Sequence, residues 1–449
     1  MYGVKKVNSS NSKVKNTQNN PFLDDKLVYF CIFALRTIKF ILYLFSSQCF
    51  APLLFADLSI VKIDNKINFL VFIINKSRSV FHNIVTQFSN QMKSFFIGNL
   101  EVKLPVIQGG MGVGVSLSGL ASAVANEGGI GVISCAGLGL IYHKSPGDYL
   151  NKCILGLKEE ITKAKEKSKG IIGVNIMVAL SNYADMVKTS IAEKVDVIFS
   201  GAGLPFDLPS YLSNDSTTKL VPIVSSSRAA KIICDKWKNN YNYLPDAIVV
   251  EGPKAGGHLG FKINQIEDEQ YSLEHIIPEV VNIANSYKSE KNIPVIAAGG
   301  ISSGKDILRF IEMGASGVQL GTMFVTTLEC DASETFKNVF INAKKEDIRI
   351  IQSPVGMPGR AIDGEFIQSV EKGQETPKNC PFHCIKTCDY TKSPYCIVQA
   401  LYQAARGNMK KGYAFTGINV HLSEKISSVK EVISNLKAEF LNAKFQGQY

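Results

Sequence analysis

Three short apolar runs that end in glycine or other small residues constrain the fold of this chain most. They span residues 247–250, 294–298 and 317–320, and they are followed by Gly256-Gly257, Gly299-Gly300 and Gly321. Apolar, β-branched runs of this length are typical of buried parallel strands, and glycine at their carboxyl ends lets the backbone approach a ligand closely. Three such strands in succession indicate one rim of a (β/α)8 barrel, where the last loops hold phosphate.

Further apolar runs precede these three and alternate with helical patterns. The expected strands are 104–108, 131–134, 171–177, 195–200, 221–224 and 246–250, followed by 294–298 and 317–320. The expected helices are 116–126 with Ser116 as its N-cap, 148–167, 183–193, one that ends at 237, 395–406 and 427–440. Alternating strands and helices predict a parallel α/β sheet, and eight strands favour a closed barrel. An open doubly wound sheet is the alternative. It would have a glycine-rich fingerprint after its first strand, and the glycines of 109–114 partly match that fingerprint.

Size and composition place the chain among ordinary globular proteins. Its 449 residues, 45% apolar and 20% charged, exceed the about 250 residues that a barrel needs. The net charge is +10, but lysines alternate with acids, as in 158–169, so we expect no nucleic-acid partner. Several of the ten cysteines lie in apolar runs, which favours a reducing compartment and a cytoplasmic location.

The first 91 residues differ from the rest. Residues 1–20 are rich in Asn, Lys and Ser, which predicts disorder, and 27–45 are mostly apolar. Arg36 and Lys39 interrupt this stretch, and each would add about 2.5–3.5 kcal/mol to the free energy of inserting it into a membrane. We therefore expect no membrane association unless the extension is retained. Because Met92 directly precedes the barrel pattern, we predict that the functional polypeptide begins near it. The predicted division is therefore an extension (1–91), a cofactor-binding barrel (92–345), and a loop, Cys-rich insertion and closing helices (346–449).

The predicted barrel rim combines an anion site with a proton-transfer group. Gly299-Gly300 and Gly321-Thr322 leave backbone N–H groups accessible, and the helix after Gly300 would direct its N-terminal dipole at phosphate. Either pair alone would be explained by a tight turn, whereas both together favour phosphate. His258, flanked by glycines, can accept a proton or donate a hydrogen bond to an anion. Asn175 either contacts a planar heterocycle or caps the next helix.

Five motifs, in this order and spacing, resemble the nitronate monooxygenase (2-nitropropane dioxygenase) family. They are Pro105–Gly114, Gly173–Asn175, Ala255–His258, Ala298–Ile301 and Gln319–Phe324. The resemblance covers roughly 104–324 and implies a barrel that binds FMN. The FMN-dependent enoyl-ACP reductases look very similar, so the motifs are more specific for the cofactor than for the reaction.

The resemblance implies roles for individual residues. His258 matches the catalytic histidine, which would remove the α-proton of a nitroalkane or hold its nitronate. Oxidation of the nitronate with O2 would then give a carbonyl compound and nitrite. Met111 and its neighbours would pack along the isoalloxazine, which Asn175 would also contact. The predicted cofactor-binding residues are Gly110, Met111, Gly112, Asn175, Glu251, Gly256, Gly257, Gly299, Gly300, Gln319, Leu320, Gly321 and Thr322, of which the last four and Gly300 would hold the phosphate.

Two other functions remain open. Glu251 stands where many monooxygenases have glutamine and is reminiscent of the enoyl reductases, so an NAD(P)H-dependent enoyl-thioester reductase is the main alternative. A phosphate-ligand-binding barrel without redox activity is the third interpretation. The partners expected are a small-molecule substrate and O2, and the sequence is compatible with a homo-oligomer.

The C-terminal third contains a regular set of cysteines. Cys380, Cys384 and Cys388 recur every fourth residue, and Cys396 follows. On a helix this spacing would place the thiols along one face, with Pro381 in its first turn. They would either bind zinc or an iron–sulfur cluster or form a buried stripe of reduced thiols. Because the spacing matches no common signature, we predict no metal and keep the four as candidates. The loop 353–360 ends in Arg360, for which we expect a surface carboxylate partner rather than an anionic substrate.

Overall fold

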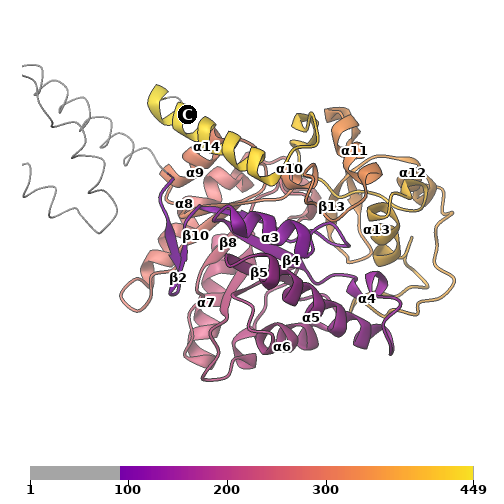
Figure 1. Cartoon of the computed structure of the whole chain (residues 1–449), viewed down its shortest axis with the longest axis horizontal. Coiled ribbons are helices and arrows are strands. Elements are labelled where there is room, and N and C mark those ends of the chain that lie inside the picture. Colours follow the sequence, from indigo (N-terminus) through magenta and orange to yellow (C-terminus); the bar gives the residue numbers. More distant parts are fainter. Residues whose placement is uncertain (1–91, 448–449) are drawn as a thin grey trace, which may run out of the picture. The chain divides into compact units, whose positions relative to one another are not determined.

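Eight parallel strands of the computed structural model, which describes residues 92–447, close into a barrel (Figure 1). In barrel order they are β3 (Val106–Gln108), β4 (Ile130–Ser134), β5 (Ile171–Met177), β6 (Val197–Gly201), β7 (Lys219–Val224), β8 (Ile248–Glu251), β10 (Val295–Ala298) and β11 (Gly317–Leu320). Strand β11 pairs with β3 and closes the ring. The predicted (β/α)8 barrel is confirmed, and the doubly wound alternative is wrong.

The strands are mostly apolar because most of their residues are buried on both faces of the sheet. Ile130 and Val132 of β4 belong to the cluster inside the barrel, whereas Ile133 packs outward against the helices. A hairpin of β1 (Phe95–Ile97) and β2 (Leu100–Val102) contributes Ile97 and Val102 to the inner cluster. This two-sided burial explains why the strands appear in the sequence as continuous apolar runs rather than alternating ones.

The helices surround the barrel, but they do not follow the strands in a strict one-to-one alternation. They are α3 (Ser118–Asn126), α4 (Leu138–Ile141), α5 (Tyr149–Lys167), α6 (Tyr183–Ala192), α7 (Ser227–Tyr241), α8 (Leu273–Ser286), α9 (Gly304–Glu312), α10 (Thr322–Val325), α11 (Glu334–Asn342), α12 (Glu365–Glu371), α13 (Ile397–Ala405) and α14 (Val429–Gln446). Helix α14 packs against α9 and α3, and so completes the outer ring after β11 (Figure 1). Between β6 and β7 stands only the short 3-10 helix Leu208–Tyr211.

A small antiparallel sheet lies outside the barrel and joins two distant parts of the chain. It consists of β12 (Ile348–Gln352), β13 (Pro358–Ile362) and β9 (Gly257–His258). Strand β9 follows barrel strand β8, so the sheet attaches the C-terminal segment directly to the barrel rim. Other short 3-10 helices are Ile263–Gln265, Glu269–Tyr271, Lys345–Asp347, Met409–Lys411 and Val420–Leu422.

The predicted N-cap of the first barrel helix is wrong. Helix α3 begins at Ser118, its N-cap is Leu117, and no side chain of that residue caps it. The Asp331 carboxylate instead accepts hydrogen bonds from the backbone N–H groups of Leu117, Gly119 and Leu120. A long-range carboxylate therefore satisfies the free amides at the start of the helix. Ser116 accepts a hydrogen bond from the Met111 N–H instead.

The expected helix over the cysteines is also absent. Helix α12 ends at Glu371 and α13 begins at Ile397, and the segment between them consists of turns, bends and one isolated bridge, Leu180 to Ile385. Cys380, Cys384 and Cys388 lie in this irregular segment. Their four-residue spacing therefore does not place them on one face of a helix.

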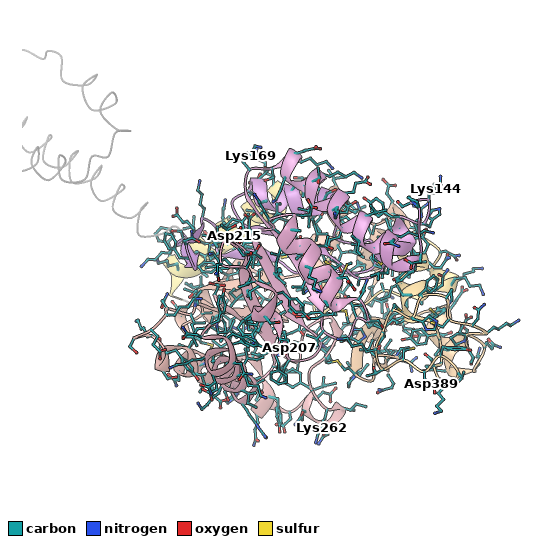
Figure 2. The ribbon with its side chains drawn as sticks, turned by 90° about the horizontal axis from the view of Figure 1, so that it is seen from below. Lys144, Lys169, Asp207, Asp215, Lys262 and Asp389 are labelled. Carbon is teal, nitrogen blue, oxygen red and sulfur yellow. The ribbon has the colours of Figure 1, made fainter. Side chains whose placement is uncertain are left out.

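Charged side chains are spread over the outside of the described molecule. Figure 2 shows Lys144, Lys169, Asp207, Asp215, Lys262 and Asp389 on separate parts of its periphery. None of the helices between residues 92 and 447 is long and apolar enough to cross a bilayer. The predictions for residues 1–91, including the apolar stretch 27–45, fall outside the described residues.

We expect Asp331→Ala to lower the free energy of unfolding by about 1–2 kcal/mol, because it removes the cap of α3. Urea denaturation followed by circular dichroism measures this change. Asp215→Ala is the control, because Asp215 is exposed and should change the stability by less than about 0.5 kcal/mol. Equal stability of the two variants would contradict the capping role.

Candidate active site

One large cavity opens at the carboxyl ends of the barrel strands. Its volume is about 570 Å³, which lies within the range of small-molecule and cofactor sites. Every residue predicted for the site lines it: Gly110, Met111, Gly112, Asn175, Glu251, Gly256, Gly257, His258, Gly299, Gly300, Gln319, Leu320, Gly321 and Thr322. The structure therefore brings these residues together, while their roles as catalytic or cofactor-binding groups stay predictions.

The first barrel loop reaches the cavity through a close approach to β5. A Cβ atom at Gly110 would collide with the side chain of Asn175, so only glycine lets the two segments pack at this distance. The hydroxyl of Ser116 accepts a hydrogen bond from the Met111 N–H at 2.8 Å, which fixes the loop beside the cavity. Both Met111 and Asn175 are thereby presented at the same wall.

The rim after β10 and β11 is built from backbone. Gly299 and Gly300 have φ values of 99° and 76°, a left-handed conformation that glycine adopts without strain. Thr322 begins α10, and its hydroxyl accepts a hydrogen bond from the Gly417 N–H at 3.0 Å. The Asn419 amide donates to the Gly300 carbonyl at 2.9 Å. The rim is thus completed by residues from the C-terminal segment.

The start of α9 does not offer its amides to the cavity in the way that the sequence suggested. Asp306 accepts hydrogen bonds from the N–H groups of Ser302 and Ser303, and Glu439 of α14 accepts one from Gly304. These two carboxylates already complement the positive end of the helix dipole. An anion at the rim would therefore depend on the turns at Gly299-Gly300 and Gly321-Thr322.

His258 is held at the cavity wall by partners from the C-terminal segment. Its Nε2 lies 2.7 Å from the Ser353 Oγ, and its ring makes an edge contact with Phe415 at 5.0 Å between centroids. Burial lowers the pKa of His258 to about 4. The imidazole is therefore neutral near pH 7 and is able to accept a proton.

Glu251 ends strand β8 and faces the same cavity. Burial raises the pKa of its carboxyl to about 7, since no positive partner offsets the lost hydration. Near neutral pH the carboxyl thus changes between a neutral hydrogen-bond donor and an anion. His258 and Glu251 together form a base and an acid whose pKa values the environment has moved in opposite directions.

The expectation for Arg360 is wrong. Its side chain is buried and donates two hydrogen bonds, to the Pro253 carbonyl at 2.7 Å and to the Ala255 carbonyl at 2.6 Å. Burial lowers its pKa to about 10, so it remains charged at neutral pH. Arg360 therefore holds the loop that leads to His258, rather than a surface carboxylate or a substrate.

The C-terminal segment contributes to the cavity, which the sequence motifs did not predict. The additional lining residues from this segment are Met357, Leu401, Tyr413, Phe415, Thr416, Gly417, Ile418, Asn419, Leu422 and Ser423. A signal was present in Gly417-Ile-Asn419, a small and polar stretch between apolar residues. Ser225 and Ser226, which follow β7, both line the cavity, and Ser226 also caps α7.

A closed barrel with a deep cavity at the carboxyl ends of its strands, walled by backbone turns and a neutral histidine, has the construction of a barrel enzyme. The nitronate monooxygenase family model matches residues 93–194 and 155–439, and the chain belongs to this family. It is accordingly an oxidoreductase, and the resemblance stated from its motifs is confirmed.

Individual proteins are similar to this chain in sequence or in structure. The probable nitronate monooxygenase of Staphylococcus aureus (strain MSSA476) is 28% identical over 311 residues, which cover 61% of this chain and 79% of that protein. FabK from Thermotoga maritima is similar in structure, with a TM-score of 0.58, 27% identity and coverage of 76% of this chain and 95% of that one. Nitroalkane oxidase from Streptomyces ansochromogenes shares the fold, with a TM-score of 0.59 and 20% identity. The match covers 77% of this chain and 98% of that one.

We predict that Arg360→Met lowers the free energy of unfolding by about 2–4 kcal/mol, because two buried carbonyls lose their donor. Chemical denaturation of the purified protein measures this loss. Arg349→Met in the neighbouring strand is the matched control, because Arg349 is 39% exposed and its ion pairs contribute less than about 1 kcal/mol. If both variants lose the same stability, Arg360 does not hold the loop.

Proposed function

We propose that this protein is an FMN-dependent nitronate monooxygenase that oxidises alkyl nitronates with O2 to carbonyl compounds and nitrite. The observation that carries the proposal is the neutral His258 on the wall of a cavity whose far rim is made of the Gly299-Gly300 and Gly321-Thr322 turns. The name of the curated Staphylococcus aureus relative supports the same reaction.

The cavity fits FMN in size and in chemistry. Its volume of about 570 Å³ suits a ligand of this class. The glycine turns leave room for a phosphate against backbone N–H groups, and Asn175 can hydrogen-bond a planar heterocycle. When bound, FMN supplies the redox chemistry, while the protein supplies orientation and a polar environment.

The residues of this chain have separable tasks in the proposed reaction. His258, neutral and held by Ser353, removes the α-proton of a nitroalkane or donates a hydrogen bond to the nitronate. Glu251 controls the charge of the cavity around neutral pH. Phe415 and the other apolar wall residues exclude water, which strengthens the polar contacts that remain.

An enoyl-thioester reductase that uses NAD(P)H is the second candidate. It is favoured by the acid at Glu251, which is reminiscent of the enoyl reductases that the sequence motifs also resemble. Steady-state assays on one preparation distinguish the two functions. Oxygen uptake with nitrite release from a nitronate supports the monooxygenase, whereas rapid NADH oxidation that depends on an enoyl thioester supports the reductase. A purified protein that cannot be loaded with FMN would contradict both.

We expect His258→Asn to lower turnover of the neutral nitroalkane by about 100-fold or more, because the group that accepts its α-proton is lost. The flavin content should stay unchanged, which absorbance measures. The matched control is His275→Asn, since His275 also pairs with a serine, Ser272 at 2.7 Å, but does not line the cavity. Turnover that survives in the His258 variant would remove His258 from the reaction.

The charge of Glu251 should make the binding of an anionic substrate depend on pH. Because its pKa is about 7, the carboxyl is neutral below pH 7 and repels an anionic nitronate above it. We expect KM for preformed nitronate, from initial rates, to rise about 10-fold between pH 6 and pH 8, equivalent to about 1.4 kcal/mol. Glu251→Gln should abolish this rise, whereas the surface variant Glu290→Gln should retain it. A rise that persists in Glu251→Gln would show that another group titrates.

A further inference from the structure

The four C-terminal cysteines converge although they share no helix. Cys380, Cys384, Cys388 and Cys396 all line a second cavity of about 200 Å³, distinct from the cavity at the barrel rim. Within the described residues the other cysteines, Cys135, Cys153, Cys234 and Cys330, are buried in the core, whereas these four are only partly buried. All of them are free thiols.

A packing role does not account for this arrangement. Thiols that merely fill a core lie against other side chains, as Cys234 does, and leave no space between them. Here the four cysteine residues line a cavity instead.

We propose that Cys380, Cys384, Cys388 and Cys396 are the ligands of an iron–sulfur cluster seated in this second cavity. Four cysteine thiolates are the ligand set of such clusters. Soft sulfur ligands also select zinc, so the two must be separated by geometry.

The geometry favours a cluster over a single ion. Zinc–sulfur bonds of about 2.3 Å would draw four sulfurs to within about 4 Å of one another and leave no cavity between them. A cluster contributes its own iron and sulfide atoms, so its protein ligands stand farther apart around a larger space.

Backbone N–H groups already point at the thiols. The His383 N–H donates to the Cys380 Sγ at 3.4 Å. Cys396 occupies the N-cap of α13, and the backbone of Gln399 and Val398 hydrogen-bonds its thiol. Hydrogen bonds to the sulfurs are one of the means by which proteins set the potential of iron–sulfur clusters.

Aromatic side chains connect the two cavities. Tyr395 lines the cysteine cavity, and its hydroxyl donates to the Tyr413 hydroxyl at 3.1 Å. Tyr413 contacts Phe415, and Phe415 contacts His258, each with 5.0 Å between ring centroids. A one-electron carrier at the cysteines would therefore be linked to the barrel cavity by side chains in contact. Asp389, adjacent to Cys388, lies at the outer edge of the molecule, so this site is close to the surface (Figure 2).

The test is the metal and sulfide content of the full chain purified without oxygen, or reconstituted anaerobically with ferrous iron, sulfide and dithiothreitol. We expect iron and acid-labile sulfide in equal amounts, about four of each per chain. Reduction with dithionite should give an electron paramagnetic resonance signal of the cluster. Stoichiometric zinc without sulfide, or no metal at all, would overturn the proposal.

Cysteine variants locate the site. Cys384→Ser and Cys388→Ser should each lose at least half of the iron and sulfide, whereas Cys234→Ser, a core cysteine outside the cavity, should retain both. Circular dichroism checks that each variant is folded. If the Cys384 variant fails to fold, Cys380→Ser replaces it. Full iron and sulfide in folded variants of all these cavity cysteines would refute the assignment.

Discussion

The pairing of β13 with β9 is the constraint on which the candidate site depends. Strand β9 contains only Gly257 and His258, and so short a strand has little stability of its own. It is ordered because Gly359 pairs with His258 and because the Arg360 guanidinium bonds the carbonyls of Pro253 and Ala255. The position of the histidine is therefore set by residues about a hundred positions later in the chain, not by the barrel strand before it.

The electrostatics of the cavity follow from the same packing. Burial keeps His258 neutral and moves the pKa of Glu251 to about 7, while the amides of α9 are already bonded to Asp306 and Glu439. Few fixed charges therefore face the cavity below neutral pH. An anion entering it would be held by backbone dipoles rather than by a salt bridge, and its binding would respond to the protonation of Glu251.

The sequence predicted the features that depend on local pattern and missed those that depend on distant partners. The strands Ile171–Met177 and Gly317–Leu320 were predicted to the residue, because most residues of each are apolar and buried. The glycine turns were found because they directly follow such strands. Asp331, Ser353 and Asn419 were missed, because each acts on a segment far away in the sequence. The cysteine spacing predicted a helix that is absent, since a four-residue repeat fixes no conformation when Pro381 and the positive φ of His383 interrupt it.

The segment after residue 345 is consequently part of the site rather than an appendage to the barrel. It supplies Ser353 to His258, closes the rim at Gly300 and Thr322 with Gly417 and Asn419, and returns α14 to the barrel wall. The series from Tyr395 through Tyr413 and Phe415 runs within this same segment. These contacts link the cysteine cavity to Phe415, the ring that packs against His258. Residues of the C-terminal segment line both cavities.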